Sequence, residues 1–245
     1  MTPLSLAHLA PGSAFRLLIV CALALHIAGG SIGIVSGYAA ILARKGGGLH
    51  RRAGLAFTAS MVVMGAMAMI LAVRIPQRGN IAGGLLAAYL VTTGWMAMRR
   101  DTNGRRFEIG AGLFALALAL VQVGFGLEAQ ASPGHRLDGY PPAPYFVFAA
   151  ITASLAWGDL RLALNGGRGG RLARHIGRMG LALFFAAASF FLGQQKVMPA
   201  FMRGSPALLL LGLAPLGLTV FWLVRIRLSK RRPRAALRPA ADVAS

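Results

Sequence analysis

Seven long apolar stretches dominate the 245-residue chain and constrain its fold more than any other feature. A helix needs about 20 mostly apolar residues to cross roughly 30 Å of hydrocarbon, and each stretch is close to that length. Hydrophobic residues make up 56% of the chain and charged residues 13%, a balance that excludes an ordinary soluble domain. The sequence therefore predicts an all-α, seven-transmembrane-helix bundle. The predicted spans are Phe15–Ile41, Ala53–Val73, Ile81–Met98, Ile109–Leu127, Tyr145–Leu164, Met179–Gln195 and Pro206–Val224.

The 26 lysines and arginines are distributed unevenly between the two sets of loops. Most of them lie after the first, third, fifth and seventh predicted spans, in the segments 44–52, 99–106, 161–178 and 225–238. Cytoplasmic loops carry the excess of basic residues in membrane proteins. This distribution predicts an N-terminus outside and a C-terminus in the cytoplasm.

The three cytoplasmic loops share a pattern of glycines and several arginines, with a further glycine where the next span begins. Because glycine permits tight turns, we predict three helical hairpins plus one helix. The chain then divides into a short periplasmic N-terminus (1–14), a seven-helix membrane domain (15–226) and a basic disordered tail (227–245).

The net charge of +20 would suggest nucleic acid as the partner of a soluble protein. Here the basic residues flank apolar spans, so the predicted partners are the lipid bilayer and its anionic headgroups, with no nucleic acid. The excess of arginine over lysine is typical of GC-rich bacteria. We therefore expect a multi-pass protein of the bacterial inner (plasma) membrane.

One histidine falls close to the predicted bilayer midplane. His26 lies 11 residues beyond Phe15, which is about 16 Å along a helix. An ionisable side chain at that depth is costly and marks a candidate functional residue. The alternative is a neutral histidine that is hydrogen-bonded inside the bundle.

Two further histidines lie at nearly equal depth on the cytoplasmic side. His50 precedes the second predicted span and His175 precedes the sixth. Two neutral imidazoles on facing helices could ligate a haem iron or a metal. Asp159 could orient one imidazole. Four neighbouring arginines could pair with haem propionates or phosphates: Arg51, Arg52, Arg174 and Arg178. The alternative is a pair of interfacial histidines that cap helices and contact lipid headgroups.

Polar residues also gather near the predicted outer surface. The loop from Glu128 to Phe146 contains four prolines, which stiffen it. It forms either an ordered lid or, with the end of the sixth span, a polar outer vestibule. The candidate vestibule residues are Glu128, His135, Asp138, Tyr140, Gln194 and Gln195.

Several functional classes lack their signatures. The stretch KGGGLHRRAG (Lys45 to Gly54) is glycine-rich, but its lysine precedes the glycines and no Ser or Thr follows, unlike a phosphate-binding P-loop. The only cysteine, Cys21, excludes an internal disulfide and a cysteine-based metal cage. No serine–histidine–carboxylate or paired-carboxylate pattern indicates a hydrolase.

Four segments together resemble a family of bacterial multi-spanning membrane proteins that carry a domain of unknown function. They are His26–Gly54, Tyr89–Arg100, Asp138–Phe148 and Arg174–Gln195. The similarity covers most of Phe15 to Arg203 and implies a helical membrane protein. The histidines at helix starts are more loosely similar to b-type cytochromes of the cytochrome b561 kind, which place two histidine pairs on four helices. That resemblance implies haem b as the cofactor.

Three functional hypotheses follow from these features. The first is a membrane redox protein that binds haem b between His50 and His175, with His26 assisting proton or quinone contact. The second is a transporter of a small solute or proton, with His26 as the titrating group. The third is a non-catalytic membrane scaffold whose histidines are structural.

Overall fold

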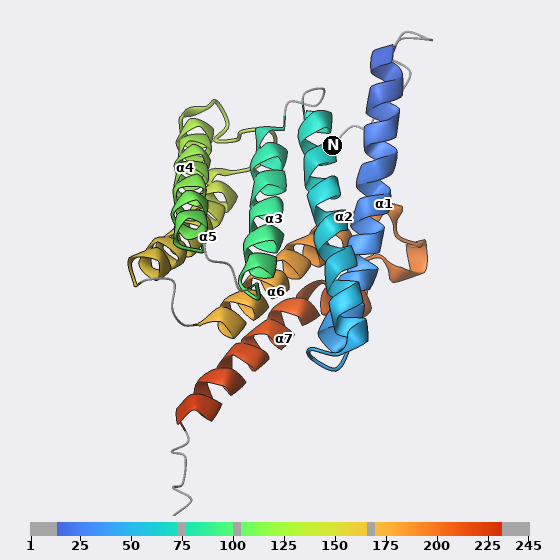
Figure 1. The fold of residues 1–245 in the computed structure, drawn as a ribbon. Coiled ribbons are helices and arrows are strands. Elements are labelled where there is room, and N and C mark those ends of the chain that lie inside the picture. Colours follow the sequence, from blue (N-terminus) through green and yellow to red (C-terminus); the bar gives the residue numbers. More distant parts are fainter. Residues whose placement is uncertain (1–13, 73–76, 100–103, 166–169, 232–245) are drawn as a thin grey trace, which may run out of the picture.

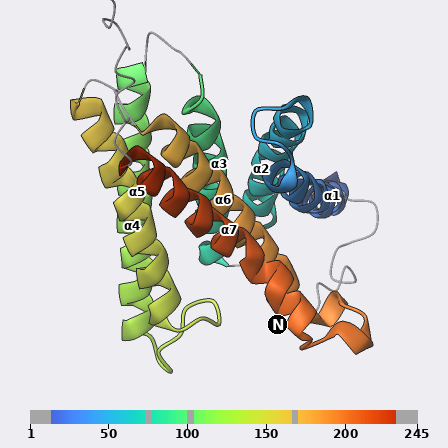
Figure 2. The same cartoon turned by 90° about the horizontal axis from the view of Figure 1, so that it is seen from below.

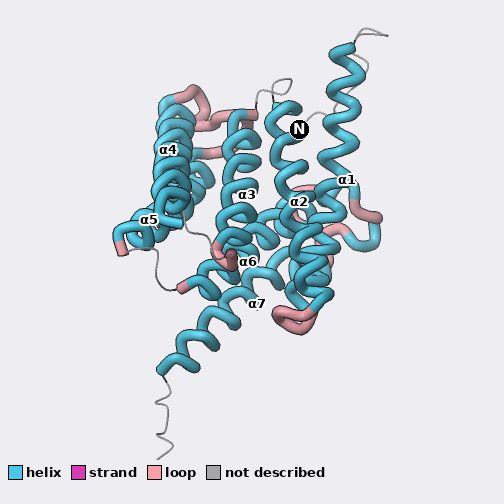
Figure 3. The backbone as a smooth tube through the Cα atoms, viewed as in Figure 1, coloured by secondary structure: helices cyan, strands magenta, loops and turns pink. Residues whose placement is uncertain are grey.

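The computed structural model describes residues 14–72, 77–99, 104–165 and 170–231, and these segments are helical apart from short connections (Figures 1 and 3). The α-helices are α1 (Ala14–Leu42), α2 (Gly48–Ala72), α3 (Arg78–Met96), α4 (Gly104–Ala131), α5 (Pro142–Leu164), α6 (Arg171–Phe191) and α7 (Pro206–Arg231). Two short 3₁₀ turns, η2 (Gln195–Val197) and η3 (Ala200–Met202), connect α6 to α7. The all-α prediction is confirmed for this part of the chain.

Five helices are long and apolar enough to cross a membrane, namely α1, α2, α4, α5 and α7. The protein is therefore a multi-pass membrane protein by length and composition. The remaining two helices, α3 and α6, are not in this set, although the sequence predicted a membrane span at each. Each has its own physical reason. The central helix α3 is mostly covered by its neighbours, so it does not need an apolar surface on all sides. The helix α6 begins at Arg171, well before the predicted start at Met179, and therefore includes arginines and a histidine.

The pairing of helices agrees with the first of the three predicted hairpins and differs from the other two. The most extensive packing joins α1 to α2, α4 to α5 and α6 to α7, whereas α3 contacts α2, α4 and α6. The α4–α5 pair is close because glycines of α4 face large side chains of α5. A Cβ at Gly112 would lie 2.7 Å from Leu160, and one at Gly126 would lie 2.8 Å from Phe146. Small residues permit such close helix contacts in membranes.

The α6–α7 pair runs obliquely to the upright helices α1 to α4 (Figure 1). Seen from below, the two helices lie side by side and cross beneath α3 (Figure 2). A Cβ at Gly180 of α6 would lie 1.9 Å from Thr219 Oγ1 of α7, so only glycine permits this contact. The membrane orientation of the termini stays a prediction.

A proline in α7 links this oblique pair to α1. Pro215 lacks an N–H, which leaves the carbonyl of Leu211 without its usual helical donor. The hydroxyl of Tyr38 in α1 donates to that carbonyl. A backbone carbonyl without a partner is costly inside a membrane, so this hydrogen bond satisfies the Leu211 carbonyl and joins α1 to α7.

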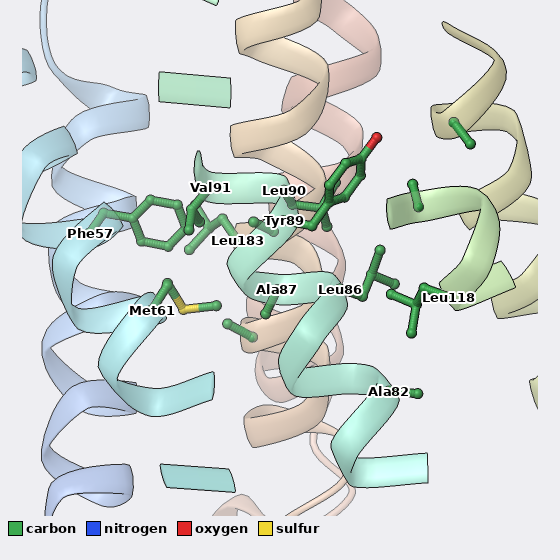
Figure 4. Packing of buried hydrophobic residues seen from close by; sticks show 14 residues of the cluster. Phe57, Met61, Ala82, Leu86, Ala87, Tyr89, Leu90, Val91, Leu118 and Leu183 are labelled. Atoms are coloured by element: carbon green, nitrogen blue, oxygen red, sulfur yellow. The ribbon is translucent and has the colours of Figure 1, made fainter. Parts of the chain in front are cut away.

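The main hydrophobic core surrounds α3 (Figure 4). Phe57 and Met61 of α2 point toward α3 and Leu183 of α6, and Leu86 of α3 points toward Leu118 of α4. At the α2–α3 crossing a Cβ on Gly65 or on Gly84 would lie 2.8 Å from the carbonyl oxygen of the other glycine. The backbones therefore pack directly against each other at this point.

The two predicted terminal segments fall mostly outside the described residues, which begin at 14 and end at 231. At the C-terminal end, α7 continues to Arg231. The residues from Arg227 to Arg231 are therefore helical, and the predicted disordered tail does not begin at 227.

Candidate functional site at the His50–His175 pair

The structure brings His50 and His175 together. His50 lies in the first turn of α2 and His175 in the second turn of α6. Their ring centroids are 6.2 Å apart, and the ring planes meet at 73° in an edge-to-face arrangement. Both side chains are half-buried. The sequence placed them at matched depth, and the fold places them next to each other.

Backbone carbonyls fix the tautomer of both rings. His50 Nδ1 lies 2.9 Å from the carbonyl oxygen of Ala40, and His175 Nδ1 lies 2.9 Å from that of Gly94. A carbonyl oxygen only accepts hydrogen bonds, so each Nδ1 carries a proton. In the neutral imidazole the Nε2 atom then has a free lone pair. Histidines that ligate metals are oriented in this way by their second nitrogen.

The glycine-rich turn between α1 and α2 places His50. Gly46 adopts a positive φ of 76°, and the amide of Gly47 donates to the carbonyl of Arg44 at 3.0 Å. Lys45 Nζ donates to the carbonyl of Ile41 at the end of α1. The turn reverses the chain tightly, so the His50 ring reaches back to Ala40. The stretch KGGGLHRRAG thus forms a helix–helix corner that positions a histidine.

The four arginines predicted beside the histidines separate into two kinds. Arg51 and Arg52 are exposed on α2, next to His50. Arg174 is largely buried and forms a two-pronged ion pair with Glu108 of α4. Arg178 is buried and pairs with Asp159. Only the α2 arginines have guanidinium groups available at the surface of the site.

Asp159 takes a different role from the predicted one. Its carboxylate is fully buried, pairs with Arg178 and Arg174, and accepts a hydrogen bond of 2.5 Å from the Tyr89 hydroxyl. The Nδ1 acceptor of His175 is instead the carbonyl of Gly94. The structure therefore places Asp159 in a charge network and not beside an imidazole.

This network, called the inner charge cluster below, joins four helices beside the histidine pair. Arg178 also donates to Thr93 Oγ1, and its guanidinium lies 4.9 Å from the centre of the Tyr89 ring. Two carboxylates and two guanidinium groups give it no net charge. Its members are Tyr89 and Thr93 of α3, Glu108 of α4, Asp159 of α5, and Arg174 and Arg178 of α6.

Sequence reasoning did not identify Glu108, Tyr89 or Thr93 as members of a site. Glu108 lies in the first turns of an apolar helix and is only 7% exposed. A buried carboxylate requires a partner. The sequence does contain a signal for this ion pair. Glu108 directly precedes an apolar run, and arginines lie in the first turns of another helix, α6.

His26 is separate from the histidine pair. It is half-buried in α1, and its Nδ1 lies 3.1 Å from the carbonyl oxygen of Met64 in α2. A Cβ at Gly29 would lie 3.1 Å from the carbonyl oxygen of Ser60, so α1 and α2 pack closely beside His26. The hydrogen bond ties two helices together, as the structural alternative expects.

A second set of ionic contacts, called the outer charge cluster below, lies at the opposite ends of the helices. Arg78 donates to both carboxylate oxygens of Glu128, at 2.8 and 2.9 Å. The Arg78 backbone N–H donates to Asp138 at 2.6 Å. Asp138 and His135 both adopt positive φ angles, of 53° and 50°. The loop is a folded turn held by Arg78.

The predicted outer vestibule is only partly assembled. Glu128 and Asp138 meet at Arg78, whereas Tyr140 is 43% exposed and His135 Nδ1 contacts only its own loop, at the carbonyl of Gln130. Gln194 and Gln195 lie in the connection between α6 and α7, away from the α4–α5 loop in both views (Figures 1 and 2). The structure does not bring the two glutamines to this loop.

Within the described segments there is no group of three or more His, Cys, Asp or Glu side chains that could hold a metal ion. Comparison of the chain with protein-family models, with curated proteins and with solved structures finds no match in any of the three. The resemblance to a family of bacterial membrane proteins therefore stays a prediction.

Proposed function

We propose that the chain is a membrane redox protein that binds one haem b between His50 and His175. The observation that carries the proposal is the histidine pair itself, with ring centroids 6.2 Å apart and both Nδ1 atoms on backbone carbonyls. The five apolar helices place this pair in a membrane protein. The hydrogen bonds leave one lone pair on each ring for a ligand.

The spacing of the rings supports a shared iron. A ring nitrogen lies about 1 Å from its centroid, given bonds near 1.3 Å. Two nitrogens that face each other across these rings would be about 4 Å apart, which suits two metal–nitrogen bonds of about 2 Å.

The donor set favours haem over a bare metal ion. Protein zinc sites use three or four side-chain ligands, and the described residues offer no such group here. Haem supplies four nitrogens itself and needs only axial ligands. When bound, haem provides one-electron redox chemistry. His50 and His175 would hold its iron, and Arg51 and Arg52, which are exposed beside His50, would pair with its propionates.

The test is a reduced-minus-oxidised absorption spectrum of the purified full-length protein, with haem quantified as the pyridine haemochrome. We expect an α-band that is lost in His50→Ala and in His175→Ala. His135→Ala is the matched control, because His135 is exposed on the far loop and should leave the band unchanged. A colourless protein, or an α-band that survives in both His50→Ala and His175→Ala, would overturn the proposal.

Proton or solute transport through His26 and a purely structural scaffold stay predictions. Uptake into proteoliposomes that is abolished in His26→Ala would favour transport. Stable, colourless protein whose histidine variants lose only stability would favour the scaffold.

A further inference from the structure

A groove runs between α5 and α6 beside the inner charge cluster. Its volume is about 280 Å³, and its lining includes Gly158 of α5 with Arg174, Gly177 and Arg178 of α6. Ligand sites for drug-sized molecules usually start near 300 Å³. The groove therefore suits a single ring or a head group.

One side of the groove is formed by the membrane helix α5. α5 is long and apolar enough to span a bilayer, and Gly158 and its neighbour Trp157 are exposed on it. Gly158 lies about 24 Å along α5 from Pro142, still within the roughly 30 Å of hydrocarbon. A ligand would therefore enter sideways from the lipid.

Arg174, which lines the groove, has one hydrogen-bond donor that lacks an acceptor. The Nε atom of Arg174 is buried and has no hydrogen-bond partner among the described residues. A buried donor without an acceptor destabilises the structure. A carbonyl oxygen of a molecule bound against Arg174 would give Nε an acceptor, while the Nη atoms keep their contacts to Glu108 and Asp159.

The charge balance favours a neutral ligand. Glu108 and Asp159 already neutralise Arg174 and Arg178, so an anionic ligand would leave an uncompensated buried negative charge. A neutral molecule with carbonyl acceptors carries no such penalty. A phosphate, a fatty acid or an anionic headgroup is therefore disfavoured.

We propose that the α5–α6 groove binds the head group of a membrane quinone. Its role as the electron-transfer partner of the histidine pair rests on the proposed haem function, whereas the binding itself does not. Arg174 precedes His175 in the chain, and Arg178 is one helical turn beyond it. The groove and the histidine pair therefore share the same part of α6.

The experiment titrates the full-length protein in nanodiscs with ubiquinone bearing one isoprene unit and follows tryptophan fluorescence, because Trp157 adjoins Gly158. We expect saturable quenching that is weakened at least tenfold by Gly158→Leu. A Cβ at Gly158 would meet no atom within 4 Å, so the substitution should fill the groove without disturbing the fold. Gly124→Leu on α4 is the matched control, because its Cβ is also unobstructed and the site is remote.

Equal, non-saturable quenching in all three proteins would overturn the inference, as would oleate binding more tightly than the quinone in a Gly158-dependent way. The haem spectrum of the same preparations separates the two proposals. Quinone binding without haem refutes only the haem function, and haem without saturable quinone binding refutes only the groove.

Discussion

The two glutamates of α4 carry the same charge and have opposite surroundings. Glu108 lies near the start of the helix and is 7% exposed, whereas Glu128 lies about 30 Å further along α4, where half of its side chain is exposed. Both oxygens of each carboxylate accept from one arginine, from two nitrogens of Arg174 at Glu108 and from the single Nη1 of Arg78 at Glu128. The comparison separates what an ion pair contributes when it is buried from what it contributes at a surface.

Burial changes the consequence of losing a partner. In the inner charge cluster, removal of one carboxylate strands a guanidinium group in a low-dielectric interior, which typically costs about 3–5 kcal/mol. In the outer charge cluster, water and salt screen the charges, and exposed pairs contribute about 0–1 kcal/mol. The inner cluster should therefore determine the stability of the bundle, and the outer cluster should mainly shape one loop.

The largest effect is expected from Asp159→Ala. Asp159 is fully buried and pairs with both Arg174 and Arg178. Its removal leaves two guanidinium groups with a single carboxylate between them, and we expect a loss of about 3–5 kcal/mol. The measurement is unfolding of the purified protein in mixed micelles, followed by intrinsic fluorescence.

A double-mutant cycle with Arg178→Met is the control for this prediction. If the cost of Asp159→Ala comes from the stranded charge, then Asp159→Ala combined with Arg178→Met should be less destabilising than the sum of the single variants. Strict additivity would show that the two residues do not act as a charge pair.

Tyr89→Phe should have the next largest effect. The substitution removes only the hydroxyl that donates to Asp159 at 2.5 Å. Hydrogen bonds to charged groups contribute about 1.5–3 kcal/mol, so the variant should be less stable by that amount. Tyr140→Phe is the matched control, because Tyr140 is 43% exposed in the outer loop. An equal response of both variants in the same unfolding assay would contradict the special position of Tyr89.

An intermediate effect is expected from Asp138→Ala in the outer cluster. The Asp138 side chain is only 7% exposed and accepts the backbone N–H of Arg78 at 2.6 Å. Its φ of 53° also disfavours alanine. We expect a loss of about 1–2 kcal/mol, given one stranded donor and the backbone strain. Asp138→Asn keeps an acceptor and tolerates this φ, so its midpoint of unfolding should stay near that of the wild type. A large loss in the asparagine variant would show that the negative charge itself is required.

How much the sequence predicted depends on whether a feature is local or tertiary. The apolar stretches predicted the helices, because hydrophobic length is a local property of the chain. The depth of His50 and His175 along the chain indicated that they could face each other, and their rings are in contact. In the inner charge cluster the sequence indicated Asp159 and the two α6 arginines but not their partners Tyr89 and Glu108, because these lie on other helices and only the packing around α3 brings them together.

The start of α6 shows the same limit in another form. The apolar window placed a span at Met179–Gln195, but the helix begins at Arg171. The polar first turns are helical because their arginines find partners on α3 and α4, such as Glu108 and the carbonyl of Ala97. A hydropathy pattern does not reveal partners that lie elsewhere in the chain. The sequence therefore predicted the histidines and several charged residues beside them, but not Glu108 or the ion pairs that join these charges.

The smallest effect is expected from Glu128→Gln, and it is the sharpest test of the comparison. Glu128 and Arg78 are 50% and 42% exposed at their side chains, so loss of the pair should cost under about 1 kcal/mol. Raising the salt concentration from 0.05 to about 0.5 M shortens the screening length severalfold and should abolish even this difference. Under the same change the deficit of Asp159→Ala should persist, because salt does not reach a buried pair. If Glu128→Gln were as destabilising as Asp159→Ala, burial would not be what distinguishes the outer charge cluster from the inner one.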